Sequence, residues 1–278
     1  MARRAGPIDE ATIQKWMREG RGAGAFETYR PWLETYDVPS SGRRHRLPSL
    51  KPPGRLVHLL SDLELANFLV NEFRTTVVDL REQFPLDRVA SHEIALRAGI
   101  RHPVTSLGTP HVMTTDLLVL TRSNGVSAFE AIAVKPSSML ENARVIEKLE
   151  IERRYWNERD VSWRIFTEEH FHPTAVHHLA SIRQFWDAAY FRECLGDIFD
   201  ELVEELMDLV EQRADELVQE TAERLGDCFS IRPQLIADIV KHLLARQLIA
   251  TDITDRMSVS QRPWSMYRRN RAVIREVV

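Results

Sequence analysis

The stretch that decides the fold is TDLLVLTRSNGVSAFEAIAVK, residues 115–135. Two apolar runs, 115–121 and 129–135, are separated by a Ser-Asn-Gly sequence at 123–125. Apolar runs of this length are typical of buried strands, and Asn-Gly between them favours a tight hairpin turn. We therefore expect two antiparallel neighbouring strands within a sheet.

Working outward from this hairpin, helical and strand-like patterns alternate. The N-cap sequence Ser61-Asp62-Leu63-Glu64 precedes apolar residues that predict a helix over about 61–73. The remaining predicted elements are helices at 9–19, 92–99 and 141–159 and strands at 75–80 and 162–167. This order predicts an α/β (α+β) fold in which a mixed sheet is flanked by helices. The stretch 39–58 is rich in proline, glycine and basic residues, which predicts an exposed loop or irregular strand.

The pattern changes after Glu168. Residues 172–225 are almost wholly helical in pattern, and 245–260 predicts the end of a helix followed by a short β-hairpin. Helices that end in a two-stranded wing are typical of a winged-helix domain. We therefore expect two domains, 1–170 with the mixed sheet and 171–278 with an all-helical or winged-helix-like fold.

Composition excludes several classes of protein. Hydrophobic residues make up 44% of the 278 residues, and no apolar run approaches the roughly 20 residues that cross a bilayer. The polar N-terminus indicates no signal peptide, so we expect a cytoplasmic protein without a membrane segment. Cys194 and Cys228 lack disulfide or metal-ligand spacing and are interpreted as structural thiols. The histidines likewise indicate no zinc site; those considered are His102, His111, His177 and His178.

The net charge of -4 hides an uneven distribution. Residues 1–60 hold 11 Lys or Arg against 6 Asp or Glu, whereas residues 193–227 hold 2 against 13. A basic segment can bind phosphates by releasing counterions, and the acidic segment suits water or a basic partner. The alternative for each segment is an ordinary solvated surface.

Three polar residues stand out by their positions. Asp116 lies at the start of one apolar strand, Lys135 at the end of the next, and Glu64 on the helix that precedes the sheet. Carboxylates bind a hard divalent cation, which activates water and polarises a phosphate, and a lysine can orient that water or offset charge. The alternative is an unrelated surface Asp and strand-end Lys.

Glu152 is a fourth candidate. The helix over 141–159 has an apolar stripe of Val145, Ile146, Leu149 and Trp156, and Glu152 lies on that stripe. An inward carboxylate is costly unless it is paired or bound to a metal. The alternative is a salt bridge, for example to Arg153. Trp156 and Trp163 are interpreted as core residues rather than as side chains that stack on DNA bases.

Several strings occur together in the order of one family. They are PSSGRRHR (39–46), GRLVHLLSDLELANFL (54–69), DLREQFPL (79–86), MTTDLLV (113–119), AIAVKP (131–136) and EKLEIERRYW (147–156). Over about residues 10–170 the chain resembles the TnsA family, which supplies the end-cleaving subunit of heteromeric cut-and-paste transposases. The later region is similar in layout to the family's C-terminal winged-helix domain.

The resemblance implies a restriction-endonuclease-like catalytic domain that hydrolyses the 5′ strand at transposon ends with Mg2+, for which Mn2+ substitutes. It implies catalytic roles for Glu64, Asp116 and Lys135, with Glu64 and Asp116 also binding the metal. The implied partners are transposon-end DNA, a DDE transposase (TnsB) and an AAA+ regulator (TnsC). TnsC is expected at the C-terminal region. The basic tail there could contact DNA or an acidic partner surface, of which we favour the regulator; its arginines are Arg268, Arg269, Arg271 and Arg275.

The chain departs from the family pattern two residues before Lys135. The family has a polar ligand there, whereas this chain has Ala133. Glu130 cannot replace it, because an odd offset along a strand reverses the face. The Val134 carbonyl, a water or Glu152 could instead complete the metal coordination. Alternatively, the site binds metal more weakly, or cleavage depends on partner proteins to assemble the site.

A basic loop before the 61–73 helix supplies the candidate phosphate contacts. These DNA-binding residues are Arg43, Arg44, His45, Arg46, Lys51 and Arg55. Three functional hypotheses follow: an active endonuclease within a transposase, an assembly subunit whose nuclease site has decayed, and a self-contained repair or restriction nuclease. Retention of Glu64, Asp116 and Lys135 favours the first, and Ala133 motivates the second.

Overall fold

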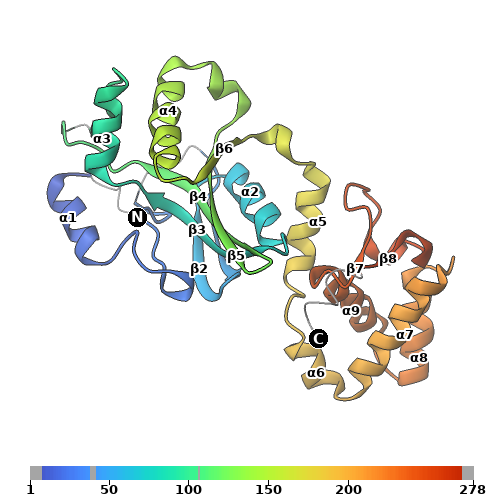
Figure 1. The fold of residues 1–278 in the computed structure, drawn as a ribbon. Coiled ribbons are helices and arrows are strands. Elements are labelled where there is room, and N and C mark those ends of the chain that lie inside the picture. The colour runs from blue at the N-terminus through green and yellow to red at the C-terminus, as the bar shows by residue number, and fades with distance from the viewer. Residues whose placement is uncertain (1–7, 38–41, 106, 271–278) are drawn as a thin grey trace. The chain divides into compact units, whose positions relative to one another are not determined.

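A four-stranded sheet forms the centre of the N-terminal unit in the computed structural model, which describes residues 8–37, 42–105 and 107–270 (Figure 1). Its strands, in spatial order, are β3 (Val77–Pro85), β4 (Thr114–Ser123), β5 (Val126–Val134) and β6 (Ser162–Phe166). β4 is antiparallel to both β3 and β5, and β6 is parallel to β5. The predicted mixed sheet is confirmed.

The hairpin between β4 and β5 turns where the sequence indicates. Ser123 pairs with Val126, and the two residues between them, Asn124 and Gly125, have φ values of 49° and 77°. Positive φ at both central residues is the requirement of the tight turn whose twist matches the strands, and Asn-Gly meets it at low cost.

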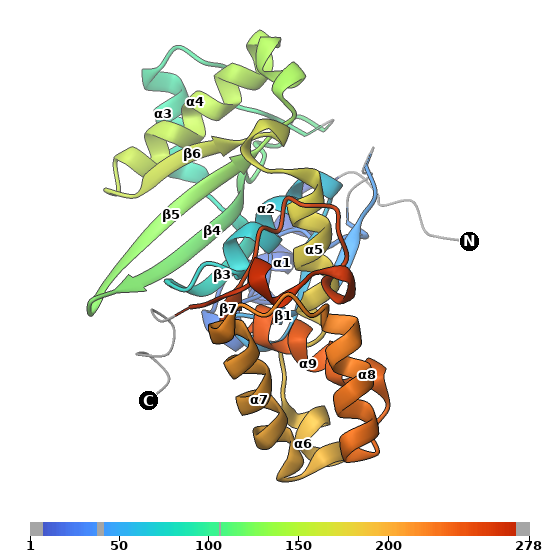
Figure 2. The ribbon, with the colours of Figure 1, turned by 90° about the vertical axis from the view of Figure 1, so that its right-hand side faces the viewer.

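Helices cover both faces of the sheet, as Figures 1 and 2 show. α2 (Asp62–Glu72) lies on one face, and α3 (Arg88–Arg97) and α4 (Ala143–Asn157) lie on the other. α3 and α4 share a buried core with Leu118 and Ala131 of the sheet. The helices predicted for this region are therefore present, with α1 (Glu10–Arg18) at the start of the chain.

Of the two alternatives predicted for 39–58, an exposed loop or an irregular strand, the structure forms strands over most of the stretch, with a register shift between Pro48 and Leu50. β1 (His45–Leu50) and β2 (Pro53–Leu59) form an antiparallel two-stranded sheet, and residues 39–41 lie outside the described residues. Val57 and Leu59 are fully or almost fully buried. Burial of these apolar residues stabilises strands that the proline and glycine content of the sequence conceals.

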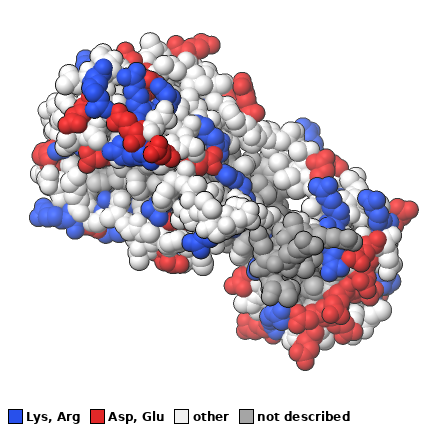
Figure 3. All heavy atoms as spheres, viewed as in Figure 1, with Lys and Arg blue, Asp and Glu red and all other residues white. Residues whose placement is uncertain are grey.

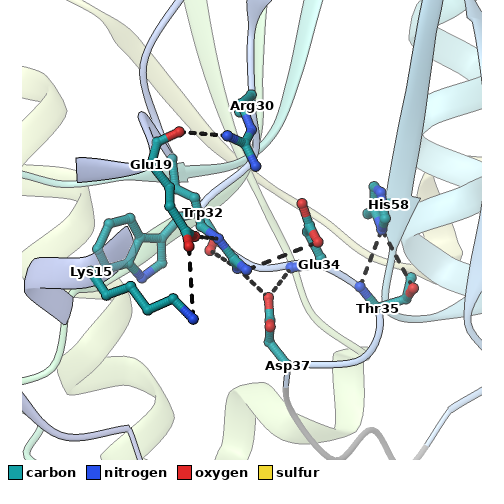
Figure 4. Close-up of polar contacts among 9 residues, drawn as sticks. Lys15, Glu19, Arg30, Trp32, Glu34, Thr35, Asp37 and His58 are labelled. Carbon is teal, nitrogen blue, oxygen red and sulfur yellow. Dashed lines mark hydrogen bonds and ion pairs between the residues drawn. The ribbon is translucent and has the colours of Figure 1, made fainter. Parts of the chain in front are cut away.

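The segment before β1 is held against β2 by polar contacts (Figure 4). Arg21 forms an ion pair with Asp37, and the backbone N–H of Thr35 donates to Nδ1 of His58 at 3.2 Å. The His58 side chain is buried, and burial is the main cause that lowers its pKa to about 4. His58 is therefore a neutral acceptor that fixes this segment on β2.

The second compact unit comprises residues 172–278 and is mainly helical. Its helices are α5 (Pro173–Arg183), α6 (Ala189–Leu195), α7 (Ile198–Gln212), α8 (Val218–Phe229) and α9 (Pro233–Ala245). Pro233 occupies the first turn of α9, where its missing N–H costs nothing. The described part of the chain contains no helix long and apolar enough to span a membrane.

The β-hairpin predicted within 245–260 is not formed. β7 (Ile249–Ala250) pairs instead with the distant β8 (Arg268–Arg269). The buried guanidinium of Arg262 donates to the carbonyl oxygens of Asp252, Asp255 and Met257. These carbonyls therefore bind a side chain and not a second strand, which is why the local pattern misleads.

Charge on this unit is segregated. Figure 3 shows acidic side chains gathered over the part of the unit where Figure 1 places α7 and α8. Arg269 forms an ion pair with Glu211 of α7, whereas Arg271 and Arg275 lie outside the described residues. Cys194 and Cys228 are exposed, so the interpretation of both thiols as structural was wrong.

Candidate active site

Glu64 lies in the first turn of α2, where the sequence predicts a helix cap. Ser61 Oγ accepts from the backbone N–H of Glu64 and donates to its Oε1, both at 3.1 Å. Glu64 Oε2 accepts from the backbone N–H of Leu60 at 3.0 Å and from the amide of Gln83 at 3.2 Å. The carboxylate is therefore held on three sides by neutral donors.

Asp116 and Lys135 meet at the end of the β4–β5 pair. Lys135 Nζ donates to Asp116 Oδ2 at 2.8 Å and to the carbonyl oxygen of Val134 at 2.7 Å. The backbone N–H of Val134 also donates to Asp116 Oδ2, at 2.7 Å. The Lys135 ammonium therefore contacts Asp116 Oδ2 and the Val134 carbonyl oxygen, two of the predicted metal ligands. Their negative charge favours a cation at this position.

The charges of Glu64, Asp116 and Lys135 interact. Burial, followed by the negative charge of Asp116, raises the pKa of Glu64 to about 7. Burial alone would lower the pKa of Lys135, but Asp116 beside it and the more distant acids raise it overall. Excess negative charge in a desolvated site is the environment that a divalent cation relieves.

Glu152 is buried on α4, as predicted, but its direct partner is Thr115. Thr115 Oγ1 donates to Glu152 Oε1 at 2.8 Å and accepts from the indole N–H of Trp156 at 2.6 Å. Burial, then repulsion from Asp116, raises the pKa of Glu152 to about 7. The charge of Glu152 therefore interacts with those of Asp116 and Lys135, while its hydrogen bond is to Thr115, the neighbour of Asp116. The alternative of a salt bridge from Glu152 to Arg153 is not formed, since Arg153 pairs with Glu150.

The helix face predicted around Glu152 needs one correction. Ile146 was placed on the buried stripe but is 44% exposed, whereas Ile151 and Tyr155 are buried. Trp156 and Trp163 belong to the core shared by α3, α4 and the sheet, as predicted. The buried face of α4 thus begins about one turn later than the apolar pattern indicates.

Gln83 is the residue of the site that the sequence did not indicate. Its side chain is 2% exposed and links Glu64 to Thr114, whose hydroxyl donates to Gln83 Oε1 at 3.1 Å. Its φ is 48° although it lies inside β3. Left-handed backbone within a strand leaves no signal in apolar periodicity, so this position could not be found from the pattern.

The position two residues before Lys135 supplies no side-chain ligand. Ala133 is fully buried beside Asp116 in the register of β4 and β5. Glu130 is bound by Arg74 at 2.7 Å and by Arg164. The expectation that Glu130 does not replace the missing ligand is therefore consistent with its contacts.

The donor set suits a hard cation with several waters. Within the described ranges, no three His, Cys, Asp or Glu side chains converge into a ready-made metal cluster. The oxygens that remain are the carboxylates of Glu64 and Asp116 and the carbonyl of Val134. Mg2+ is usually held by one or two carboxylates and keeps several waters, so these residues fit it. A closed zinc site needs four nitrogen or sulfur ligands and is not built here.

Comparison with known proteins shows what part of the chain is similar to. Residues 74–168 match the family model described as TnsA-like endonuclease N terminal. The chain is also 47% identical over 173 residues to the transposon Tn7 transposition protein TnsA of Escherichia coli, a match that spans 62% of this chain and 62% of that protein. Over the matched residues, the chain is similar to TnsA. Its matched region, 74–168, contains Asp116, Lys135 and Glu152, and Glu64 precedes it.

The predicted DNA contacts that are exposed lie on and before β1. Arg43, Arg44 and Arg46 are exposed, and His45 is half-buried. Arg43 and His45 both contact Asp62, at 3.0 and 2.7 Å, two residues before Glu64. These contacts place the basic strand beside the start of α2.

Two of the predicted DNA contacts have other partners. Arg55 is 6% exposed, and its Nη1 donates to both carboxylate oxygens of Glu82, which is fully buried. A guanidinium enclosed in this way cannot reach a phosphate, so the DNA-binding prediction for Arg55 was wrong. Lys51 Nζ donates to the carbonyl oxygen of Arg74 at 2.7 Å, which directs it to the end of α2.

Proposed function

We propose that this chain is a member of the TnsA family and an endonuclease subunit of a transposase that hydrolyses the 5′ strand of DNA at transposon ends with Mg2+. The observation that carries the proposal is the assembly of Glu64, Asp116 and Lys135, from three separate elements, into one electrostatic cluster. The similarity to a transposition protein supports a role in transposition.

Each residue has a role that its contacts support. Asp116, the Val134 carbonyl and Glu64 would hold the cation, with Glu152 adding negative charge through Thr115. A bound Mg2+ supplies polarisation of the scissile phosphate and a water of lowered pKa. Lys135 keeps its proton because its pKa is raised, so it can offset the charge that develops on the phosphate.

DNA would approach along the basic strand. Arg43, Arg44 and Arg46 are exposed, and Arg43 contacts Asp62 at the start of the helix that carries Glu64. Phosphates bound by these arginines would therefore lie close to the cluster. Arg55 is excluded by its burial.

The proposed division of labour follows the two compact units. Residues 1–170 would cleave DNA, and 171–278 would bind partners, a DDE transposase and an AAA+ regulator. The exposed acidic residues of α7 and α8 suit a basic protein surface rather than DNA, because they would repel phosphates. A subunit that acts on bacterial chromosomal DNA would work in the cytoplasm.

A strand-resolved cleavage assay tests the proposal. Labelled transposon-end DNA is incubated with the full chain, with and without the partner transposase, in Mg2+, Mn2+ or a chelator. We expect metal-dependent nicking of the 5′ strand that Asp116→Ala and Lys135→Ala abolish. The matched controls are Lys148→Ala and Asp215→Ala, which change exposed residues of the same types. Cleavage retained in both site variants would refute the proposal.

Ala133 favours a second candidate, an assembly subunit with a weakened nuclease site. This hypothesis predicts normal binding to the transposase and DNA but no metal-dependent cut under any of these conditions. Cleavage without any partner would instead favour the self-contained nuclease. The same assay therefore separates the three hypotheses.

A further inference from the structure

We propose that Gln83 is a positioning residue that holds the Glu64 carboxylate in the orientation needed to bind the metal. The inference rests on the proposed nuclease function, but it assigns a role to a residue outside the acid and lysine cluster. Four observations carry it: the division of donors around Glu64, the anchoring of the Gln83 amide, its backbone conformation and its place in the register.

The donors around Glu64 are divided unequally between its two oxygens. Oε2 accepts from Leu60 N at 3.0 Å and from Gln83 Nε2 at 3.2 Å, whereas Oε1 accepts from Ser61 Oγ at 3.1 Å. A carboxylate oxygen has two lone-pair sites. Both sites of Oε2 are therefore occupied, and Oε1 retains one for a cation.

Gln83 is itself held both at its side-chain amide oxygen and at its backbone carbonyl. Thr114 Oγ1 donates to its oxygen at 3.1 Å, and the backbone carbonyl of Gln83 accepts from Trp32 N at 3.2 Å. A carboxylate only accepts hydrogen bonds, so the amide nitrogen must face Glu64 and the amide oxygen must face Thr114. Because Gln83 is only 2% exposed, bulk water has little access to this contact.

The backbone of Gln83 is adapted to this contact. Regular strands direct successive side chains to opposite faces. Here Glu82 contacts Arg55 of β2 and Gln83 contacts Glu64 of α2, whereas Phe84 packs against Trp156 of α4. The φ of 48° at Gln83 breaks the alternation, so that consecutive residues reach the same side.

Left-handed backbone favours glycine, and residues with a side chain adopt it mainly where the surroundings enforce it. The register puts Gln83 opposite Asp116, since Glu82 pairs with Leu117 and Phe84 with Thr115. The strained residue thus lies directly across from the second acid of the site. A side chain kept in such a conformation points to a function for its amide.

Two variants separate positioning from a purely structural role. Gln83→Met removes the amide at similar length, and Gln83→Gly removes it while relieving the backbone strain. Mn2+ binding to the full chain is measured by isothermal titration calorimetry, and nicking kinetics are measured on transposon-end DNA with the partner transposase present. We expect both variants to bind Mn2+ about tenfold or more weakly. We also expect kcat to fall with an unchanged KM for DNA, because Gln83 is buried away from any DNA surface.

Gln247→Gly is the matched control. Gln247 has a φ of 56° in the second unit, so the change relieves the same kind of strain far from Glu64 in the sequence. It should leave Mn2+ affinity unchanged. If wild-type protein binds Mn2+ and both Gln83 variants bind it equally well, the positioning role is refuted. If wild-type protein neither binds Mn2+ nor cuts, the proposed function fails, and this inference fails with it.

Discussion

Replacement of Arg55 provides a direct test of whether this arginine serves the fold or DNA. In Arg55→Met the side chain keeps its length but loses Nη1, which donates to the two oxygens of Glu82 at 2.9 and 2.7 Å, and Nη2, which donates to the carbonyl of Leu80. Glu82 would keep the backbone N–H of His58 as a donor, at 3.1 Å, but would lose its cationic partner.

The expected loss is large because Glu82 is fully buried. Breaking a buried ion pair by removing one partner typically costs about 3–5 kcal/mol, since the remaining charge is left without compensation. The matched change Arg43→Met removes an ion pair whose side chains are 74% and 60% exposed. An exposed pair contributes at most about 1 kcal/mol.

The assay is urea unfolding at pH 7, with the free energy of unfolding compared at equal m-values, alongside DNA binding at fixed salt concentration. Arg55→Met should lose stability, and Arg43→Met should lose DNA affinity alone. The double variant Arg55→Met/Glu82→Leu should recover at least half of the lost stability, because no uncompensated charge remains. An Arg55→Met protein as stable as wild type, with weaker DNA binding, would refute the reasoning.

Three further predictions follow from other parts of the N-terminal unit. The pKa of His58 is about 4 in the folded protein, against 6.5 unfolded, so folding favours the neutral ring and stability is lost as the pH falls below about 6.5. Lowering the pH from 7 to 5 should therefore reduce the free energy of unfolding of the wild type by about 2 kcal/mol more than that of His58→Asn, measured by urea unfolding. Equal pH dependence in the two proteins would contradict this. Gly22→Ala should lower the urea midpoint of unfolding more than Gly20→Ala does. Both glycines have a φ of 75°, but only a Cβ at Gly22 would clash with Pro85, at 2.2 Å. Equal shifts in the two variants would argue against the clash. Saturating Mn2+ at about 100 times its Kd should raise the free energy of unfolding by about 2.7 kcal/mol, and Asp116→Asn should remove this gain; a gain retained by the variant would place the metal elsewhere.

The local elements were predictable because their signals are local. The Asn-Gly turn and the Ser61 cap each satisfy backbone geometry or hydrogen bonding within a few residues, and the structure confirms both. The β1–β2 pair and the β7–β8 pair were missed. Both are stabilised by contacts with distant segments, which periodicity over a short window does not register.

The candidate site shows the same division. Glu64, Asp116 and Lys135 are recognisable from residue type and position, and the structure brings their charges together, although their catalytic roles stay a prediction. Gln83 could not be found in this way, because its importance depends on a left-handed backbone inside a strand. The burial of Arg55 could not be predicted from the sequence either, because an arginine in a basic stretch has the same sequence pattern as a residue that binds phosphate.

The amino-acid sequence by itself determined where the chain turns, where its helices begin and which residues are chemically able to bind a divalent cation and a phosphate. These properties depend on side-chain type and on neighbours within about one turn of helix or hairpin. Only the tertiary structure decided which charged groups are desolvated, as for Arg55 and Glu82, and which donors orient Glu64. The reason is physical: burial and hydrogen-bond geometry depend on segments that are distant in the chain and adjacent in space.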